Sequence, residues 1–386
     1  MRRVVTQPRA NLAARARELG FDFVESDGEP YWNEGVYYAF TLAEIEDQLE
    51  TPSNELASLC LDLVNHVISD QRALERLKIP RHAWDLIAES WRRREPSLYG
   101  RFDFAFDGKG PARLLEYNAD TPTALFEAAV FQWVWLEDMI AQGGLPKSAD
   151  QFNSLHEKLV ARLRNVAGGR TLHMACMADS REDQGFIAYL EDCAKQAGLS
   201  TSGLPVEGIG LRRGTRFVDL NNRPIDLLFK LYPWEFMLND AFGQSPAMRQ
   251  TSFLEPPWKM LLSNKGMLPL LWEMAPRHPN LLPAYFEDDP HAADLGGRYA
   301  RKPLYSREGA NVTLADRGEV IDSDSGPYGA EGFILQALAD PPSFEGRYPI
   351  VGSWIIGEEA CGIGVREDKS PITKNNAQFV PHAIID

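Results

Sequence analysis

The feature that most constrains this chain is a strictly alternating segment followed by a turn and a second extended segment. In residues 101–107, whose sequence is RFDFAFD, every second residue is a phenylalanine, so the three rings share one face of an extended strand. The sequence GKGP at 108–111 predicts a turn, and ARLLEYN at 112–118 predicts the returning strand. The pattern therefore predicts a β-hairpin with one aromatic face and one polar face.

The polar face of this hairpin brings like charges together. If residues 107 and 112 face each other across the loop, Asp103 lies opposite Glu116 and Arg101 lies opposite Asn118. Opposed carboxylates destabilise a sheet, but that cost disappears if a divalent cation binds between them. Carboxylate and amide oxygens suit Mg²⁺, which usually arrives with nucleotide phosphates, and Arg101 is able to reach the same phosphates. The alternative is a solvated face on which Arg101 neutralises one acid, and the spacing does not choose between the two.

A long helix is expected directly after the hairpin, over residues 123–140. Asp120, Thr121 and Thr123 are residue types that cap helices, and Pro122 suits a first turn. One interpretation is that they only cap this helix. The other is that the helix N-terminus, beside a metal site, binds an anion.

The rest of the chain divides by pattern and contains no linker. Residues 41–94 have a helical pattern that begins with a capping box of Thr41 and Glu44, and a short helix is expected over 10–19. Residues 171–230 alternate between strand and helix patterns, and strands and turns dominate the last third. No internal repeat is present in the sequence, so we expect one closely connected enzyme of 386 residues.

Composition excludes several classes of protein. The sequence has 40 Lys and Arg residues against 55 Asp and Glu residues, a net charge of −15, which argues against nucleic acid or an anionic membrane surface as the main partner. Its four cysteines are far apart, so neither a disulfide framework nor a zinc site is expected. The sequence contains no apolar run as long as a membrane span and no signal-peptide core, and we expect a cytoplasmic protein.

Three lysines lie within apolar or turn sequences: Lys230 in LLFKLYPWE, Lys265 in LLSNKGMLP and Lys302 in YARKPLYS. Such a lysine is usually a surface residue with a buried stem. Lys302, however, precedes a glycine-containing loop with basic residues, which is a pattern that binds polyphosphate; the loop contains Ser306, Arg307 and Gly309. An ordinary surface hairpin is the alternative, since the sequence has no Walker A loop and no G-x-G-x-x-G.

Two further charged residues also have two interpretations. Arg366 ends a strand in the sequence GVRED, where a surface salt-bridge cluster is the alternative to a functional role. Glu235 lies beside Trp234 in an aromatic-rich segment, which indicates either core packing or the edge of a pocket. The sequence offers no Ser–His–Asp set and no metal-binding histidine pair.

Eight sequence blocks in a fixed order resemble one known family. They are SLYGRFDFAFDG, LLEYNADTPTALFEAAVFQW, LFKLYPWEFM, SNKGMLPLLWE, HPNLLPAYF, KPLYSREGANV, YGAEGFILQ and GSWIIGEEACGIGVRED. Together they closely resemble the synthetase part of the glutathionylspermidine synthase family and its stand-alone bacterial members. The resemblance implies an α/β (α+β) ATP-grasp fold of permuted topology, with a helical N-terminal region and an α/β lobe before the nucleotide-binding lobe.

The resemblance also implies a reaction and a site, with ATP and Mg²⁺ as cofactors. ATP phosphorylates a carboxylate, here that of the glycine in glutathione, and an amine of spermidine displaces the phosphate to form an amide. By the same resemblance, Asp103, Glu116 and Asn118 match magnesium ligands. The arginines that match the reacting centre are Arg101, Arg307 and Arg366. The residues that match nucleotide-binding positions are Lys265, Lys302, Ser306, Gly309 and Gln336, the last of them where adenine recognition is expected.

The resemblance implies a single catalytic unit over residues 1–386. Its approximate sub-lobes are 1–170, which is helical and includes the hairpin at 101–118, then 171–255, which is α/β, and 256–386, which binds the nucleotide. Bifunctional family members carry an N-terminal cysteine amidase, whereas the first cysteine here is Cys60 within a helical pattern, so we expect no amidase domain. The expected partners are small molecules only. A ligase of the same mechanism with another acid and amine, and a nucleotide-binding protein without ligase activity, are the alternatives.

Overall fold

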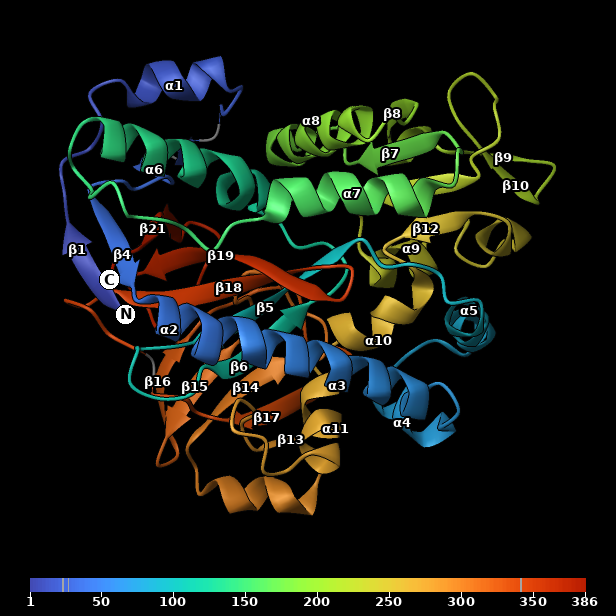
Figure 1. The fold of residues 1–386 in the computed structure, drawn as a ribbon. Coiled ribbons are helices and arrows are strands. Elements are labelled where there is room, and N and C mark those ends of the chain that lie inside the picture. Colours follow the sequence, from blue (N-terminus) through green and yellow to red (C-terminus); the bar gives the residue numbers. More distant parts are fainter. Residues whose placement is uncertain (23, 27, 341) are drawn as a thin grey trace.

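The computed structural model describes residues 1–22, 24–26, 28–340 and 342–386. Its centre is an antiparallel sheet of five strands, in which the predicted hairpin pairs with strands from the end of the chain (Figure 1). In sheet order the strands are β20 (Gln378–Val380), β19 (Glu359–Asp368), β18 (Tyr348–Ile356), β5 (Tyr99–Ala105) and β6 (Arg113–Asn118). The hairpin is therefore confirmed, and it forms one side of a larger sheet.

Helices cover both faces of this central sheet. On one face lies a continuous helical run made of α2 (Leu42–Ile45), a π-helical turn (Glu46–Glu50) and α3 (Thr51–Val67). Phe102 and Phe104 of β5 belong to the same apolar core as Leu56 and Leu63 of α3. Helices α6 (Gln132–Ala141) and α7 (Leu155–Ala167) lie on the other face, where they share a second core with Trp354 of β18. The alternation of β5 thus separates a core face from the face that carries Arg101 and Asp103.

A second antiparallel sheet lies below the first in Figure 1. Its strands, in sheet order, are β13 (Ala284–Phe286), β17 (Phe333–Ala337), β14 (Tyr299–Pro303), β15 (Thr313–Asp316) and β16 (Glu319–Ser323). Helices α10 (Met260–Ser263) and α11 (Met267–Met274) precede this sheet in the sequence.

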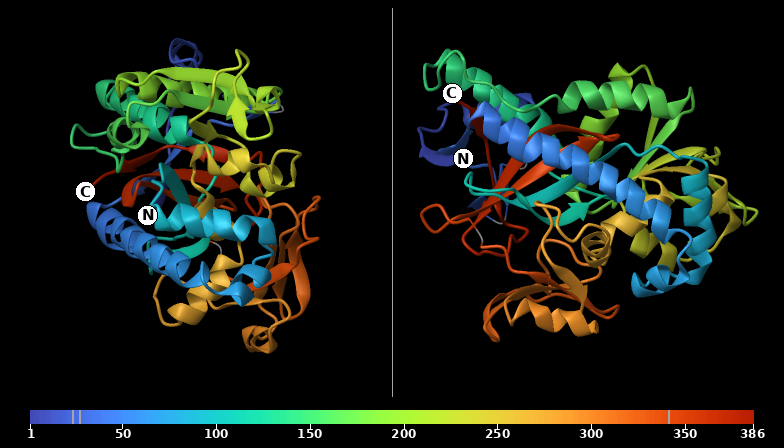
Figure 2. Two further views of the ribbon diagram at one scale, coloured as in Figure 1. Left: turned by 90° about the vertical axis from the view of Figure 1, so that its right-hand side faces the viewer. Right: turned by 60° about the horizontal axis from the view of Figure 1, so that its bottom comes forward.

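A four-stranded parallel sheet lies on the opposite side of the central sheet, as both views of Figure 2 show. Its order is β12 (Ser252–Leu254), β11 (Leu227–Lys230), β7 (Leu172–Cys176) and β8 (Thr201–Pro205). Helix α8 (Arg181–Gln196) connects β7 to β8, and α9 (Trp234–Asn239) follows β11. The predicted α/β unit at 171–230 is therefore confirmed, and its strands are parallel because helical crossovers join them.

The N-terminal and C-terminal segments meet in a fourth sheet, which has three strands. Strand β4 (Val36–Phe40) pairs with β1 (Arg2–Val5) and with β21 (His382–Ile384).

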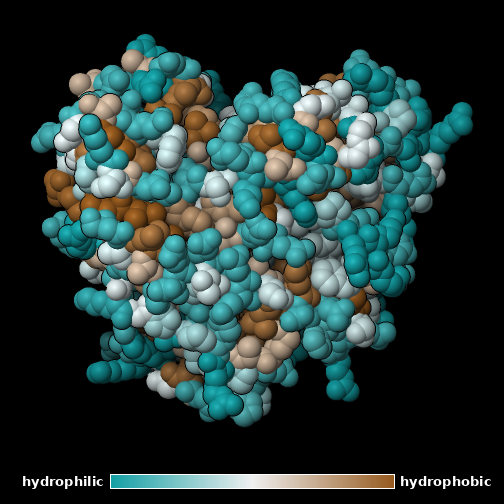
Figure 3. All heavy atoms as spheres, in the orientation of Figure 1, coloured by the Kyte–Doolittle hydropathy of each residue, from teal (hydrophilic) through white to brown (hydrophobic). Residues whose placement is uncertain are grey.

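The surface on the face shown in Figure 3 is mostly hydrophilic. None of the described helices is long and apolar enough to cross a membrane. The remaining helices are α1 (Leu12–Glu18), α4 (Gln71–Arg76) and α5 (Arg81–Arg92), and the remaining short strands are β2 (Glu25–Ser26), β3 (Glu29–Pro30), β9 (Gly210–Arg212) and β10 (Arg216–Val218).

Two predicted helix starts have different outcomes. The capping box of Thr41 and Glu44 is present, with both reciprocal hydrogen bonds. The helix expected from residue 123 begins at Leu125, and its first full turn is the π-helical segment Glu127–Phe131 (η2). Asp120 and Thr121 do not cap it, because their side chains bond to residues of other segments. The capping interpretation of these two residues is therefore wrong.

Candidate active site

The hairpin has the predicted register where the site lies. Arg101 faces Asn118, and Asp103 faces Glu116. A β-bulge between Asp103 and Phe104 then shifts the register by one residue, so the predicted pairing is wrong closer to the turn. Arg101 is only 9% exposed and Asp103 only 8% exposed. The alternative is therefore wrong about a solvated face, but Arg101 does neutralise one acid, Asp103, as that alternative held.

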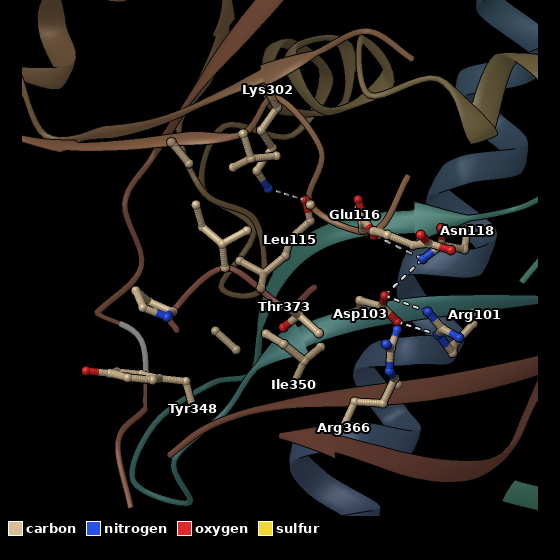
Figure 4. Close-up of a pocket in the computed structure, with 18 of the residues that line it drawn as sticks. Arg101, Asp103, Leu115, Glu116, Asn118, Lys302, Tyr348, Ile350, Arg366 and Thr373 are labelled. Carbon is tan, nitrogen blue, oxygen red and sulfur yellow. Dashed lines mark hydrogen bonds and ion pairs between the residues drawn. The ribbon is translucent and has the colours of Figure 1, made fainter. Parts of the chain in front are cut away.

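Each acid of the hairpin is paired with a cation of its own, and Figure 4 shows the pair of Arg101 and Asp103. The Nε and Nη2 atoms of Arg101 donate to the two carboxylate oxygens of Asp103, at 2.6 and 2.9 Å. The Nζ atom of Lys265 lies 2.9 Å from Oε2 of Glu116. Asn118 donates through Nδ2 to both acids, at 2.9 and 3.2 Å. The two carboxylates are thus held close together by three donors.

The two lysines near the hairpin set the ionisation of the site. Burial acts to raise the pKa of Glu116, but the charges of Lys265 and Lys302 outweigh it and lower the pKa to about 2. Burial lowers the pKa of Lys302 to about 8, against the attraction of Glu116. Lys302 donates through Nζ to the carbonyl oxygen of Leu115 at 2.8 Å and to Oε1 of Gln336 at 2.7 Å. At neutral pH the site therefore contains the ionised Glu116 beside the protonated Lys302.

The predicted magnesium ligands come together in space. Across the described parts of the chain, no group of three or more His, Cys, Asp or Glu side chains is arranged to hold a metal ion; the predicted set has two carboxylates, Asp103 and Glu116, and one amide, Asn118. The amide turns its nitrogen toward the acids, and a half-turn would present its oxygen instead. Carboxylate and carbonyl oxygens completed by phosphates are the usual magnesium ligands, so the donor set fits this ion.

The loop after β14 lies over the open end of the hairpin. The carbonyl oxygen of Ser306 accepts a hydrogen bond from Lys265 Nζ at 2.8 Å, whereas the Ser306 hydroxyl is buried and has no partner among the residues that the structure describes. Arg307 donates through Nη1 to Oγ1 of Thr121 at 2.7 Å and through Nη2 to Oε1 of Glu235 at 2.9 Å. Glu235 lines a small cavity together with Ser306 and Arg307, which agrees with the interpretation that it lies at the edge of a pocket.

The loop after β19 meets the Arg307 loop. Gly309 has a φ of +73°, and a Cβ atom there would lie 2.8 Å from the carbonyl oxygen of Thr373. Arg366 donates through Nη2 to the carbonyl oxygen of Lys374 at 2.9 Å, and Figure 4 shows its side chain pointing from β19 toward Asp103. The two loops thus close one side of the site, and Arg366 faces the pocket instead of a surface cluster.

These groups surround one cavity of about 230 Å³ between the central sheet and the second antiparallel sheet. All of the predicted site residues line it except Ser306, which lines a smaller cavity behind Glu116. The residues brought together are Arg101, Asp103, Glu116, Asn118, Lys265, Lys302, Arg307, Gly309, Gln336 and Arg366.

Two features of the site were not predicted from the sequence. The first is an apolar end of the cavity, where a small separate core meets it; its residues are Ala300, Val312, Leu314, Leu338 and Ile372. Gln336 lies beside it, but its amide is already bonded at both ends, to Lys302 and to the carbonyl oxygen of Leu114. The five apolar residues come from two strands and three loops, so no local pattern marks them.

The second feature is a pair of acids that interact electrostatically with Arg366 but do not line the cavity, the buried Glu127 and the half-buried Glu182. Glu127 accepts a hydrogen bond from the hydroxyl of Tyr31 at 2.8 Å and is 6% exposed. Burial, followed by the charge of Glu127, raises the pKa of Glu182 to about 7, against the attraction of Arg366. Glu182 lies in the first turn of α8, after the carboxyl end of β7, which is where open α/β sheets bind ligands. The position of Glu182 shortly after a predicted strand of the α/β unit was therefore the signal in the sequence that pointed to this residue.

Comparison with known proteins places this site in a family. The sequence profile described as "Glutathionylspermidine synthase preATP-grasp" matches residues 3–385. The chain belongs to the glutathionylspermidine synthase family. A Haemophilus influenzae protein named as a candidate acid–amine ligase is 44% identical over 400 positions, which cover 100% of both chains. Trypanothione synthetase of Crithidia fasciculata is 28% identical over 84% of this chain and 53% of its own length. The Escherichia coli bifunctional glutathionylspermidine synthetase/amidase is 26% identical over 94% and 62%.

The comparisons also fix the class of enzyme and the fold. The chain spans less than two thirds of the length of the trypanothione and bifunctional synthetases. As a member of this family of synthetases and ligases, the chain is an ATP-dependent C–N ligase. A glutathione synthetase-like effector of Globodera pallida superposes with a TM-score of 0.57 at 10% identity, over 90% of this chain and 89% of that chain. The mixed helix-and-sheet fold is therefore that of glutathione synthetase-like proteins of the ATP-grasp type, and its permuted topology stays a prediction.

Proposed function

We propose that this glutathionylspermidine synthase family member joins the carboxylate of a small peptide such as glutathione to an amine such as spermidine, through an acyl-phosphate. The observation that carries this proposal is the set of groups that line one cavity. The cavity has an apolar end, and two lysines, the two carboxylates of the hairpin and three arginines also line it. These groups match a nucleotide base, its phosphates, a metal ion and the reacting phosphoryl group.

The nucleotide occupies the end between the two antiparallel sheets in this proposal. An adenine base fits against the apolar group at Ala300 and Leu338. Because Gln336 is engaged by Lys302 and by a backbone carbonyl, its role is to orient Lys302, and the backbone that follows β17 is left to recognise the base. Lys265 and Lys302 then lie where phosphates extend from the base toward the hairpin.

The reaction needs charge neutralisation more than a protein nucleophile. An oxygen of the substrate carboxylate attacks the γ-phosphorus of ATP, the bond to the bridging oxygen breaks, and ADP leaves. The amine nitrogen then attacks the carbonyl carbon, loses a proton and displaces inorganic phosphate, which leaves the amide. Arg101 and Arg366 supply positive charge for the phosphoryl group and for the tetrahedral adduct. Magnesium held by the hairpin acids and Asn118 would neutralise further phosphate charge.

A group of acids near Arg366 favours a cationic acceptor. Glu127 and Glu182 both interact electrostatically with Arg366, and Asp183 adds a third carboxylate in the first turn of α8. A protonated amine would offset their mutual repulsion, as a cation does between any close carboxylates. The region of these acids is therefore suited to a polyamine, with one of its amines directed at the reacting carbonyl.

The test is ADP release by the purified protein with Mg²⁺-ATP, measured with and without glutathione and spermidine. Strong stimulation that requires both, together with an amide product of the expected mass, is the expected result. Stimulation by another acid and amine from a panel would keep the reaction and change the substrates. ATP binding without stimulation by any pair would contradict the proposal and support the alternative of a protein that binds nucleotide without ligating.

A further inference from the structure

Asp120 lies in the loop that follows the second strand of the hairpin, β6. Its side chain contacts residues of the α/β lobe. It is 1% exposed, and both of its oxygens are used. Oδ1 accepts from Lys230 Nζ at 2.6 Å, and Oδ2 accepts from the backbone N–H of Trp234 at 2.9 Å. Lys230 is the last residue of β11, and Trp234 is the first residue of α9. Asp120 therefore caps a helix of a different segment, at the carboxyl end of a parallel strand.

Lys230 is buried, and two of the three donors of its ammonium group are used in hydrogen bonds within the protein. It is 2% exposed, its Nζ atom also donates to the carbonyl oxygen of Tyr232 at 2.9 Å, and it lies 4.4 Å from the ring centroid of Trp234. The expectation of a surface lysine with a buried stem is therefore wrong for this residue. Among the described residues, Asp120 is the acid that forms a hydrogen bond and an ion pair with Lys230.

The same short loop anchors two arginines of the candidate active site. Arg307 donates to the hydroxyl oxygen of Thr121 at 2.7 Å, and Arg101 donates through Nη1 to the carbonyl oxygen of Thr123 at 2.8 Å. Arg307 also contacts Glu235, the residue after Trp234. A movement of the loop relative to α9 would thus change the position of both guanidinium groups.

Stability alone does not account for this buried pair. Apolar residues of similar volume often replace a buried ion pair at no cost, or with a gain in stability, and α9 has only six residues, Trp234–Asn239. The pair does provide a fixed geometry between two parts of the molecule. Because a displacement of about 1 Å at a reacting centre costs roughly 100-fold in rate, fixed geometry has a direct value for a ligase.

We propose that Asp120 and Lys230 are positioning residues, which act on the reaction through Arg307 and Arg101 without touching a substrate. This inference rests on the proposed function. The pair holds the loop of residues 118–123 against the end of β11, so that Thr121 and Thr123 present fixed oxygen atoms to the two arginines. Nucleotide binding depends on other residues, so the pair affects the rate of ligation far more than the affinity for ATP.

The first experiment compares Lys230→Met and Asp120→Asn with Arg9→Met. Arg9 is the matched control because it forms an equally buried pair with Glu34, at 2.8 Å, outside the cavities described above. We expect Lys230→Met to lower kcat about 10- to 100-fold while KM for ATP stays within about threefold. Arg9→Met is expected to lower the melting temperature without lowering kcat. A fall in kcat for Arg9→Met as large as that for Lys230→Met would overturn the proposal.

A double-mutant cycle tests whether Lys230 acts through Arg307. If it does, Lys230→Met lowers kcat by a smaller factor in the Arg307→Ala background than in the wild type, because one of the two arginines that it positions is already absent. Fully additive effects would contradict the proposal. The cycle Arg9→Met with Arg307→Ala is expected to be additive.

A third readout separates this inference from the proposed function. Amide hydrogen exchange over residues 118–124 is expected to become faster in Lys230→Met and in Asp120→Asn, and to stay unchanged in Arg9→Met. Unchanged exchange in both loop variants would refute the positioning role even if kcat falls. Faster exchange in a protein that ligates no acid–amine pair would instead refute the proposed function and leave the structural coupling in place.

Discussion

At the scale of single residues, the acids of the hairpin are arranged differently from the expectation of two repelling carboxylates. Asp103 is paired with Arg101, and Glu116 with Lys265. Removing either side chain would leave a buried cation without its partner, which costs stability. A test of their role must therefore keep the shape and the hydrogen bonds of the side chain and remove only its charge.

Glu116→Gln is such a test. The amide oxygen still accepts from Lys265, but the negative charge that would hold magnesium is lost, and we expect turnover to fall about 100-fold or more with a melting temperature within a few degrees of the wild type. Ligation rate and thermal unfolding measure the two effects. Glu319→Gln, on the exposed strand β16, is the control, and wild-type turnover in Glu116→Gln would remove this acid from the site.

Glu182 gives the proposed amine-binding region a pH dependence. Burial, followed by the charge of Glu127, raises its pKa to about 7, so it is an ionised acid above that pH and neutral below it. We expect KM for the amine to rise as pH falls through about 7, and to be high and nearly independent of pH in Glu182→Gln. Asp192→Asn, at the exposed far end of α8, should behave like the wild type. A wild-type profile in Glu182→Gln would place the amine elsewhere.

At the scale of elements, two loops from different sheets close the site by direct contact. The Arg307 loop follows β14, and the segment with Thr373 follows β19. Gly309 permits this contact, because a side chain there would meet the backbone of the other loop. The distance between the loops is therefore fixed by the absence of a single Cβ atom.

Gly309→Ala should separate the two loops. The added Cβ would lie 2.6 Å from the Ile372 side chain and 2.8 Å from the Thr373 carbonyl oxygen, so we expect the dissociation constant for ATP to increase about tenfold, equivalent to about 1.4 kcal/mol. Gly318→Ala is a matched control, since Gly318 has a similar φ of +84° but open space around it. Equal ATP affinities in the two variants would show that backbone strain, and not contact between the loops, is responsible.

The local elements were largely predictable, whereas their long-range contacts were not. The alternation of residues 101–107 and the Thr41–Glu44 box are short-range signals, and both produced the expected elements. Asp120 had an equally good local signal as a helix cap, but its partner Lys230 lies 110 positions away. No single sequence contains that information, because a local rule describes only one of the contacts that a polar side chain is able to make.

At the scale of the whole molecule, the C-terminal strand places an uncharged histidine in the core. His382 is fully buried, and its Nδ1 atom lies 2.8 Å from Oε1 of Gln132. Burial lowers its pKa from 6.5 to about 3 in the folded protein. Between these values the unfolded chain binds a proton that the folded chain does not, so stability falls as pH falls from 6.5 toward 3.

His382→Asn should reduce this dependence. Asparagine keeps a donor toward Gln132 but does not titrate, so the slope of unfolding free energy against pH should decrease by about 1.4 kcal/mol per pH unit below 6.5. Urea unfolding at several pH values between about 5 and 6.5 measures it. Equal slopes in the two proteins would mean that His382 is protonated in the folded state.

The candidate site as a set was predicted through resemblance, and its geometry only in part. Opposed acids at Asp103 and Glu116 followed from the alternation and the turn. The contact between Lys265 and Glu116, the apolar end near Leu338 and the acid Glu182 required the folded chain. They join segments from all three larger sheets, so no spacing rule relates them.

The central sheet also has a consequence for how the protein is synthesised. Strand β5 ends at Ala105, and its partner β18 begins at Tyr348, so a ribosome adding roughly 5–20 residues per second needs on the order of 10–50 s between them. Throughout that interval the nascent hairpin has an unpaired edge, next to a row of phenylalanines. Exposed edges of this kind invite pairing with other chains. Newly made protein is therefore most exposed to aggregation before its last forty residues emerge, and a chaperone that shields the hairpin should raise the yield of folded enzyme.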